Sequence, residues 1–403
     1  MTATIKAPPY SATLALHGGT FRSDPASGAV AVPIYQSTSY QFRDTAEAER
    51  LFALRQVGYT YTRTSNPTRD IVERRLAALE GGAGALIVAS GVSARLYALL
   101  NLAQAGDNIV LSRDIAGADV LAEQLTRFRI EPRWAASPDA EGFLRATDGN
   151  TRVYFAETLP LRDLVLFPIR DVARAADRAG IPLIIDNSAL PILVRPIESG
   201  AAIVIYRTAG PLVGHSTVSP GVLIDAGTFA WTDHAGRFPA LTAPDDSYHG
   251  EIWTEVAARF KVPLAYLMRA RMRLLRDFGD TVSPFDVFML AQGVETLPLR
   301  MRTHTENAFR AAEILKKRTD VGTICYPGVG SLLSFLPTGG ISRARRFLDA
   351  LEMIRPSGEP GSIRSAASLS AESPDGTILL SIGLEHPEDV GSDLKQALDR
   401  SAA

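Results

Sequence analysis

A chain of 403 residues is too long for one simple hydrophobic core, so two domains plus an arm are expected. The formal net charge of −2 gives no reason to expect nucleic acid or an acidic membrane as a partner. The single cysteine, Cys325, excludes an internal disulfide and has no zinc-like neighbours, so no metal site is expected. The N-terminus lacks the apolar core of a signal peptide, and no apolar run reaches membrane-spanning length, which predicts a cytoplasmic protein.

The first part of the chain combines an irregular segment with a strand–helix series. Residues 1–60 are rich in Gly, Pro, Ser and Thr, which predicts an extended arm that packs on another surface, such as a second subunit. From Glu80 onward, short apolar runs alternate with helix-like segments such as 92–106 and 169–180. The predicted strands are 85–90, 108–112, 152–157, 182–187, 201–207 and 221–225. This alternation favours an α/β domain with a mainly parallel sheet covered on both faces.

The C-terminal part has a different pattern. One or two long amphipathic helices are expected over 283–318, and a small α+β unit follows. Its predicted elements are strands at 331–337 and 377–383 and a helix at 341–352. With a boundary near residue 293, the expected parts are an arm (1–60), a large α/β domain (61–293) and a small α+β domain (294–403).

Three features follow predicted strands, where open parallel sheets bind ligands. Ser90 and Gly91 close one strand and open a helix, whose free N–H groups suit a phosphate, although a plain strand-to-helix turn is the simpler alternative. Asp186 ends another strand. A carboxylate at this position would pair with a ligand cation, and the simpler alternative is that it caps the next segment. The third feature is the loop 205–216, IYRTAGPLVGHS.

These features coincide with motifs that closely resemble the cysteine/methionine-metabolism family of pyridoxal-phosphate (PLP) enzymes, in particular its O-acetylhomoserine sulfhydrylase-like members. The motifs are YTRTSNPT (61–68), LAALEGGAGALIVASG (76–91), LIIDN (183–187), GHS (214–216) and SPFDVFMLAQGVETLPLRM (283–301). The resemblance implies the type I, aspartate-aminotransferase-like fold of PLP-dependent transferases. It also implies active sites at a dimer interface, usually within a tetramer.

The loop 205–216 departs from the family pattern. Anchored on Gly214-His215-Ser216, the resemblance places the family's Schiff-base lysine at Gly210, its threonine at Ala209 and its serine at Arg207. No lysine lies between Lys6 and Lys261 to replace it.

Other positions of the family site also differ. The residue that stacks on the pyridine ring, a tyrosine in the family, corresponds to Ala116, and a motif asparagine corresponds to Leu161. The arginine that grips the substrate carboxylate corresponds to Leu379. Standard sulfhydrylase or lyase chemistry is therefore not expected, because PLP catalysis needs these supports together. The same losses lead to the expectation that the chain takes no cofactor.

Other family positions are kept. By resemblance, Asp186 would face the pyridine nitrogen, while Tyr61 and Arg63 would hold the phosphate in a neighbouring subunit's site. The phosphate in the chain's own site would be cradled by Ser90, Gly91 and Val92.

The first hypothesis is a repurposed site, either a lysine-independent enzyme or a binder. Arg207 and Arg162, with Arg63 from a partner, would form a basic pocket for a small anionic metabolite, unless the Arg207 guanidinium simply fills the phosphate site. Candidate acid/base residues are Tyr206, His215 and Asp186, and His249 is a weaker candidate with an architectural alternative.

The second hypothesis is a non-catalytic subunit that lends Tyr61 and Arg63 to an active, lysine-bearing homologue. A third keeps PLP bound without a covalent link. A homodimer or homotetramer fits the first hypothesis, and a hetero-oligomer fits the second.

Overall fold

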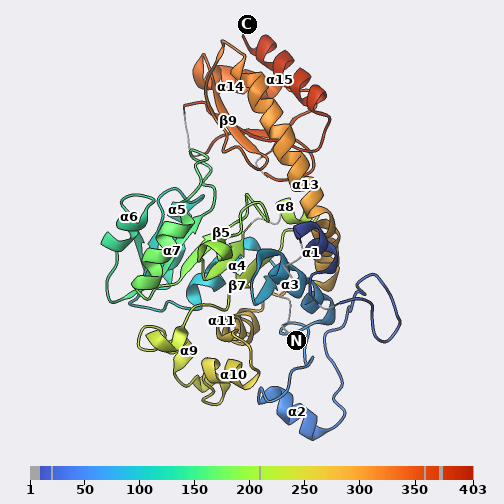
Figure 1. Ribbon diagram of the computed structural model, residues 1–403, viewed down its shortest axis with the longest axis vertical. Coiled ribbons are helices and arrows are strands. Elements are labelled where there is room, and N and C mark those ends of the chain that lie inside the picture. The colour runs from blue at the N-terminus through green and yellow to red at the C-terminus, as the bar shows by residue number, and fades with distance from the viewer. Residues whose placement is uncertain (1–9, 20, 208–209, 358–359, 372–374, 403) are drawn as a thin grey trace, which may run out of the picture.

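The computed structural model describes residues 10–19, 21–207, 210–357, 360–371 and 375–402. A larger body holds the N-terminal three quarters of the chain, and a smaller C-terminal body sits above it in Figure 1. The long helix α13 (Pro284–Lys316) runs from one body into the other, and the boundary predicted at residue 293 falls inside it. No helix of the described segments is both long and apolar enough to cross a membrane.

The large body is built on a seven-stranded sheet with the order β1-β7-β6-β5-β4-β2-β3. The strands are β1 (Gly84–Val88), β2 (Asn108–Leu111), β3 (Glu131–Trp134), β4 (Thr151–Glu157), β5 (Leu183–Asp186), β6 (Ile203–Tyr206) and β7 (Gly221–Asp225). Only β7 runs antiparallel to its neighbours in this sheet, β1 and β6. The predicted mainly parallel α/β architecture is therefore confirmed.

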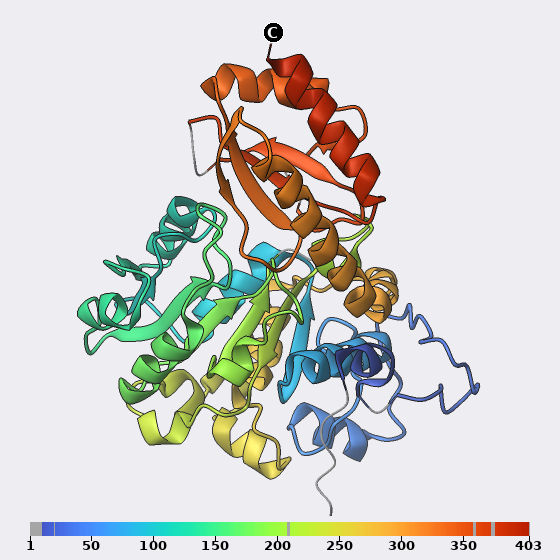
Figure 2. The same ribbon diagram turned by 45° about the horizontal axis from the view of Figure 1, so that its top comes forward.

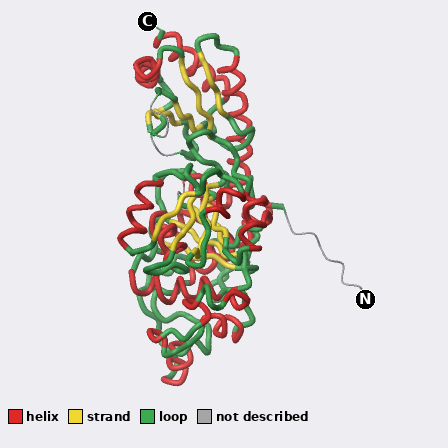
Figure 3. The backbone as a smooth tube through the Cα atoms, turned by 90° about the vertical axis from the view of Figure 1, so that its left-hand side faces the viewer, coloured by secondary structure: helices red, strands yellow, loops and turns green. Residues whose placement is uncertain are grey.

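Helices cover both faces of this sheet, as Figure 3 shows. Because side chains alternate across a strand, Val204 packs with one core cluster while Ile203 and Ile205 pack with the other. The first cluster includes residues of α3 (Pro67–Glu80) and α7 (Ile169–Arg178), and the second includes residues of α4 (Gly91–Leu100). Burial on both faces explains why the strands appear as apolar runs in the sequence.

The predicted arm is partly helical. It contains α1 (Ser11–His17), which packs against α3 and α13, and α2 (Thr45–Phe52), which is capped by the Asp44 side chain. The other helices of the large body are α5 (Ala118–Arg127), α6 (Ala140–Arg145), α8 (Gly210–Val213), α9 (Pro239–Thr242), α10 (Trp253–Arg259), α11 (Ala265–Arg269) and α12 (Arg276–Phe278). Short 3₁₀ turns lie at Pro196–Ser199, Trp231–His234 and Asp246–Tyr248, and a π-helical turn at Ala270–Leu275.

The small body is a five-stranded sheet with the order β10-β11-β12-β9-β8, packed against helices (Figure 2). Its elements are β8 (Val321–Cys325), β9 (Leu332–Pro337), α14 (Gly340–Ala350), β10 (Arg355–Pro356), β11 (Ala366–Leu369), β12 (Ile378–Ser381) and α15 (Pro387–Ser401). Its core joins the sheet to α13, α14 and α15. The loop before β9 reaches down to the large sheet and contributes to the site described next.

Candidate functional site

Two acidic side chains lie side by side where the large sheet ends. Glu157 is the last residue of β4 and pairs in register with Asp186, the last residue of β5. Both strands are parallel, so their carboxyl ends meet at one edge of the sheet. The sequence analysis identified Asp186 and missed Glu157, although both end buried apolar strands.

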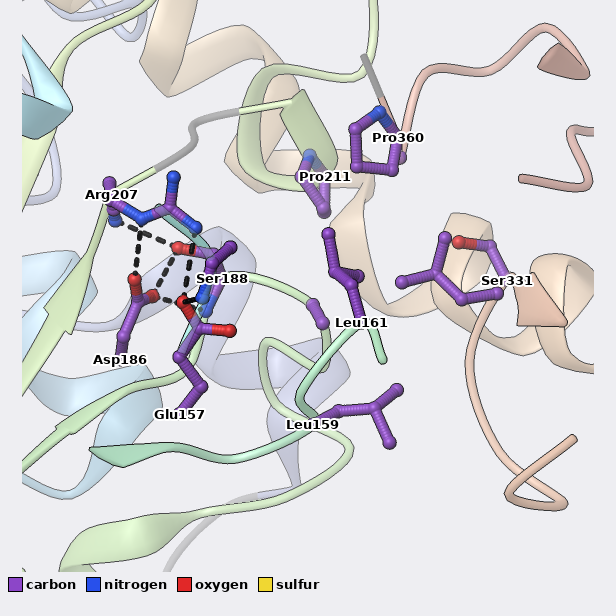
Figure 4. Close-up of a pocket in the computed structure, with 13 residues that line it drawn as sticks. Glu157, Leu159, Leu161, Asp186, Ser188, Arg207, Pro211, Ser331 and Pro360 are labelled. Atoms are coloured by element: carbon purple, nitrogen blue, oxygen red, sulfur yellow. Dashed lines mark hydrogen bonds and ion pairs between the residues drawn. The ribbon is translucent and has the colours of Figure 1, made fainter. Parts of the chain in front are cut away.

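Arg207, directly after β6, binds both carboxylates (Figure 4). Its Nε lies 3.1 Å from Oδ2 of Asp186, and its Nη2 lies 3.2 Å from Oε1 of Glu157. Its backbone N–H donates to the Ser188 hydroxyl, which in turn donates to Oδ1 of Asp186. The guanidinium therefore lies on the two carboxylates.

Glu157 is 6% exposed, and its two oxygens differ. Oε1 accepts from Arg207 and from the Ala116 backbone N–H at 2.9 Å. Within the described chain, no group donates to Oε2, which points away from Arg207 in Figure 4. Burial, followed by the nearby charge of Asp186, raises the pKa of Glu157 to about 7, although Arg207 opposes the rise.

A cavity of about 150 Å³ opens beside these charges. Its opposite wall is apolar and is drawn from both bodies of the protein: Leu159, Leu161, Pro211, Leu332 and Pro360 line it. Ser331 and Leu332 come from the start of β9 in the small body. The cavity therefore has one charged end and one apolar end.

Two of the predicted acid/base residues do not line this cavity. Tyr206 is buried on the sheet, and its hydroxyl donates to Glu80 of α3. His215 is exposed, and its Nδ1 lies 3.0 Å from the Val213 carbonyl oxygen. Of the three candidates, only Asp186 reaches the cavity.

The structure does not bring Arg162 to the cavity either. Its side chain is 57% exposed and lies 3.5 Å from Asp114. Arg63 lies in a second hollow of about 270 Å³, with its guanidinium over the Tyr61 ring at 5.4 Å. His249 lines the same hollow. Of the arginines expected in the basic pocket, the structure places only Arg207 at this cavity. The roles of Tyr61 and Arg63 in a partner's site remain predictions.

The expected phosphate cradle lies at the start of α4. Ser90 caps the helix by accepting from the Ser93 N–H at 3.2 Å, and Val92 is half-exposed. A Cβ on Gly91 would come within 1.5 Å of the Arg207 carbonyl oxygen, so only glycine permits this close packing. The cradle and the charged end of the cavity are thus in direct backbone contact.

Gly210 begins α8 and has no room for a side chain. A Cβ at this position would lie 2.6 Å from the Pro360 carbonyl oxygen. Ala209, which the sequence analysis aligned with the family threonine, lies outside the described residues.

Comparison with known proteins gives consistent matches over almost the whole chain. Residues 12–399 match the model of the "Cys/Met metabolism PLP-dependent enzyme" family. The chain is 39% identical to an O-acetyl-L-homoserine sulfhydrylase of Leptospira meyeri, covering 96% of both, and 36% identical to a homocysteine synthase of Schizosaccharomyces pombe, covering 96% of the chain and 97% of that protein.

A solved structure has nearly the same fold. The putative O-acetylhomoserine (thiol)-lyase of Campylobacter jejuni superposes with a TM-score of 0.91 at 32% identity, covering 96% of this chain and 99% of that one. It contains N'-pyridoxyl-lysine-5'-monophosphate. The predicted family resemblance and type I fold are both confirmed.

The expectation that the chain takes no cofactor is wrong. The matching family is PLP-dependent, and the Campylobacter structure carries a PLP–lysine adduct, so these findings indicate PLP. The start of α4 fits the phosphate of this group, and Asp186 fits its pyridine nitrogen, where PLP would supply an electron sink. The fit is incomplete, since Arg207 and Ser188 already occupy Oδ2 and Oδ1 of Asp186.

This competition leads to a testable prediction. Replacing Arg207 by Ser should raise the affinity for PLP about tenfold or more, because Asp186 is released from a charge-assisted hydrogen bond worth roughly 1.5–3 kcal/mol. Titration calorimetry with PLP would measure the change, with Arg162→Ser as the matched control outside the cavity. Equal affinities in all three proteins would show that Arg207 does not compete with PLP.

Proposed function

Because this chain belongs to the Cys/Met metabolism PLP-dependent enzyme family, we propose that it is an O-acetylhomoserine sulfhydrylase homologue that has lost lysine-dependent PLP chemistry. Its site then serves as a lysine-independent enzyme or as a small-molecule binder. The observation that carries this proposal is Gly210, which has no side chain and faces the Pro360 carbonyl.

No other lysine of the described chain is placed to substitute. Lys261 follows α10, at the end of the large body remote from the small body (Figure 1). Lys316 ends α13, Lys317 follows it, and Lys395 lies on α15. The bonds between α13 and α8 involve Arg300, about four turns before the end of α13. The proton carrier left beside the cavity is Glu157, with Asp186 held by Arg207.

The charged residues around the cavity determine whether it attracts the anionic ligand expected from the sequence. Arg207 is matched by Glu157 and Asp186, and Arg95 adds a second buried positive charge near them. Two positive and two negative charges leave little net attraction for an anion when both carboxylates are ionised. The geometry therefore supports a ligand without a net negative charge better than an anionic metabolite.

The proposal predicts that the purified chain lacks sulfhydrylase turnover. With O-acetylhomoserine, sulfide and added PLP, its kcat/KM should be at least ~10²–10⁴-fold below that of the Leptospira relative, the range that one positioned proton-transfer group contributes. Homocysteine formation measures the rate. Turnover within tenfold of the relative would refute the proposal. Gly210→Lys is a poor rescue variant, because the new side chain must displace Pro360.

A second candidate function, that of a non-catalytic subunit, is favoured by one observation. Tyr61 is 44% exposed and lies with Arg63 in a hollow separate from the chain's own cavity, so both are available to a neighbouring subunit. Co-expression with a lysine-bearing homologue tests it. In a hetero-oligomer, Tyr61→Ala and Arg63→Ala should lower the partner's activity, whereas a cytoplasmic homodimer or homotetramer without such a partner would rule it out.

A further inference from the structure

The polar end of the cavity offers a ligand an unused hydrogen-bond acceptor. Oε1 of Glu157 is held by Ala116 and Arg207, which fixes the carboxylate in place. The second oxygen, Oε2, receives no hydrogen bond from the described residues, and Glu157 lines the cavity. A carboxylate oxygen at the cavity that no protein group donates to can accept a hydrogen bond from a ligand.

The other end of the cavity suits only an apolar group. Leu159, Leu161 and Leu332 form its wall and belong to one apolar cluster, against which Leu379 also packs. Among the described residues that line the cavity, Arg207 is the only cation, and it lies at the polar end. A carboxylate placed against the leucines would lose its hydration without gaining a partner, which disfavours its binding.

The volume suits a small molecule. A cavity of about 150 Å³ matches a ligand body of roughly five or six non-hydrogen atoms, and because it is open on one side it does not by itself exclude the three further atoms of a carboxylate. A branched amine of five carbons has this size.

We propose that the cavity binds a small primary amine, with its amino group donating to Glu157 and an uncharged apolar tail against Leu159, Leu161 and Leu332, and that it excludes α-amino acids. This inference rests on the proposed function, because it places the ligand in a cavity that lysine-bound PLP would otherwise share. Glu157 is the ligand-binding residue, and Arg207 positions it.

Isothermal titration of the full-length protein with 3-methylbutylamine and with leucine tests the proposal. The two molecules share the amino group and the branched tail, and leucine adds only the carboxylate. The amine should bind at least about tenfold more tightly than leucine, and 4-methylpentanoate, which has the tail and no amine, should bind more weakly still. Binding of leucine or 4-methylpentanoate at or above the affinity of the amine would overturn the proposal.

Two variants test the two ends of the cavity. Glu157→Gln should weaken amine binding at least about tenfold, whereas Glu49→Gln, at an exposed glutamate of α2, should leave it unchanged. Leu161→Arg places a cation in the apolar wall and should shift the preference towards leucine without requiring any change at Glu157. Unchanged amine affinity in Glu157→Gln, or an unchanged preference in Leu161→Arg, would contradict the assignment.

The pH dependence provides another readout. Since burial raises the pKa of Glu157 to about 7, amine affinity should increase between pH 6 and 8 as this carboxyl ionises, while the amine itself stays protonated. The charged groups around Glu157 are Asp186, Arg207 and Arg95. Sulfhydrylase turnover by the chain would refute the proposed function, whereas absence of both turnover and amine selectivity would refute only this inference.

Discussion

Replacing Arg300 by Met is expected to lower the free energy of unfolding by about 3 kcal/mol and to loosen the candidate site. Arg300 lies on α13 and is 5% exposed. Its Nη1 donates to the Pro211 carbonyl at 2.7 Å, and its Nη2 donates to the carbonyls of Leu212 at 2.9 Å and Gly293 at 2.7 Å. Methionine would fill the space but leave the Pro211 and Leu212 carbonyls without this donor, each at a cost of roughly 1–3 kcal/mol, whereas the Gly293 carbonyl keeps the hydrogen bond from the Thr296 hydroxyl.

The expected loss in the free energy of unfolding is smaller than the largest summed cost of the unpaired carbonyl groups, because Arg300 is itself costly to bury. No carboxylate of the described chain pairs with Arg300, and burial lowers the pKa of its guanidinium to about 10. Removing a poorly solvated charge therefore recovers part of the loss. The cation also lies at the C-terminal end of α8, where it favours the carbonyl ends of the helix.

The effect should reach the ligand cavity because Arg300 fixes α8, and α8 provides Pro211 to the cavity wall. Urea unfolding of the wild type, Arg300→Met and Arg302→Met would measure it, since Arg302 is an exposed residue of the same helix. Amine titration of the same proteins would report on the cavity. Equal stability of the two variants would show that Arg300 does not fix α8.

The central strands of the large sheet could be predicted because they are buried on both faces and therefore form uninterrupted apolar runs. The strand β3 was missed for the opposite reason. It is an edge strand with partly exposed side chains, and its sequence Glu131-Pro-Arg-Trp134 contains a proline and no apolar run. The helix α2 was also missed, because its amphipathic segment is only eight residues long and lies in a stretch rich in turn-forming residues.

Site residues could be predicted where they end a parallel strand, because that position alone places them at the ligand-binding edge of the sheet. Asp186 and Glu157 both end strands and both belong to family motifs, but the sequence analysis used the motif of Glu157 only to place Leu161 and gave Glu157 no role. Tyr206 was expected in the site because it ends β6, yet its side chain joins the core cluster on one face of the sheet and bonds Glu80 there. Strand alternation divides the side chains between the two faces of the sheet, but the sequence does not show which face holds the ligand. The face of Tyr206 could therefore not be assigned to the site or to the core. Arg162 is polar and follows a strand, but its loop directs it to Asp114.

The buried pair formed by Tyr206 and Glu80 leads to a prediction about stability. Burial raises the pKa of Glu80 to about 8, with the hydrogen bond from Tyr206 acting in the opposite direction. Oε1 of Glu80 has no hydrogen-bond partner among the described residues. The folded protein therefore holds a proton on Glu80 at neutral pH, which the unfolded chain releases near its ordinary pKa of about 4.3.

Below the ordinary pKa of glutamate, the folded protein and the unfolded chain both carry this proton. At such pH values Glu80 therefore causes no loss of stability. As the pH rises, the unfolded chain ionises first and is favoured by up to ~1.4 kcal/mol per pH unit, until the folded carboxyl also ionises near pH 8. The stability that depends on Glu80 should therefore fall by roughly 3 kcal/mol between pH 5 and 8. Asp225 and Glu157, whose pKa values burial raises to about 7, contribute in the same direction.

Glu80→Gln separates the contribution of this residue from the other two. Glutamine keeps an acceptor for Tyr206 and cannot ionise, so the variant should gain stability relative to the wild type as the pH increases from 5 to 8. Urea unfolding at pH 5, 6.5 and 8 measures this difference, with Glu255→Gln, at an exposed glutamate of α10, as the control. A difference that stays constant over this range would mean that Glu80 is ionised in the folded protein. The Tyr206 hydroxyl would then be stabilising a buried negative charge.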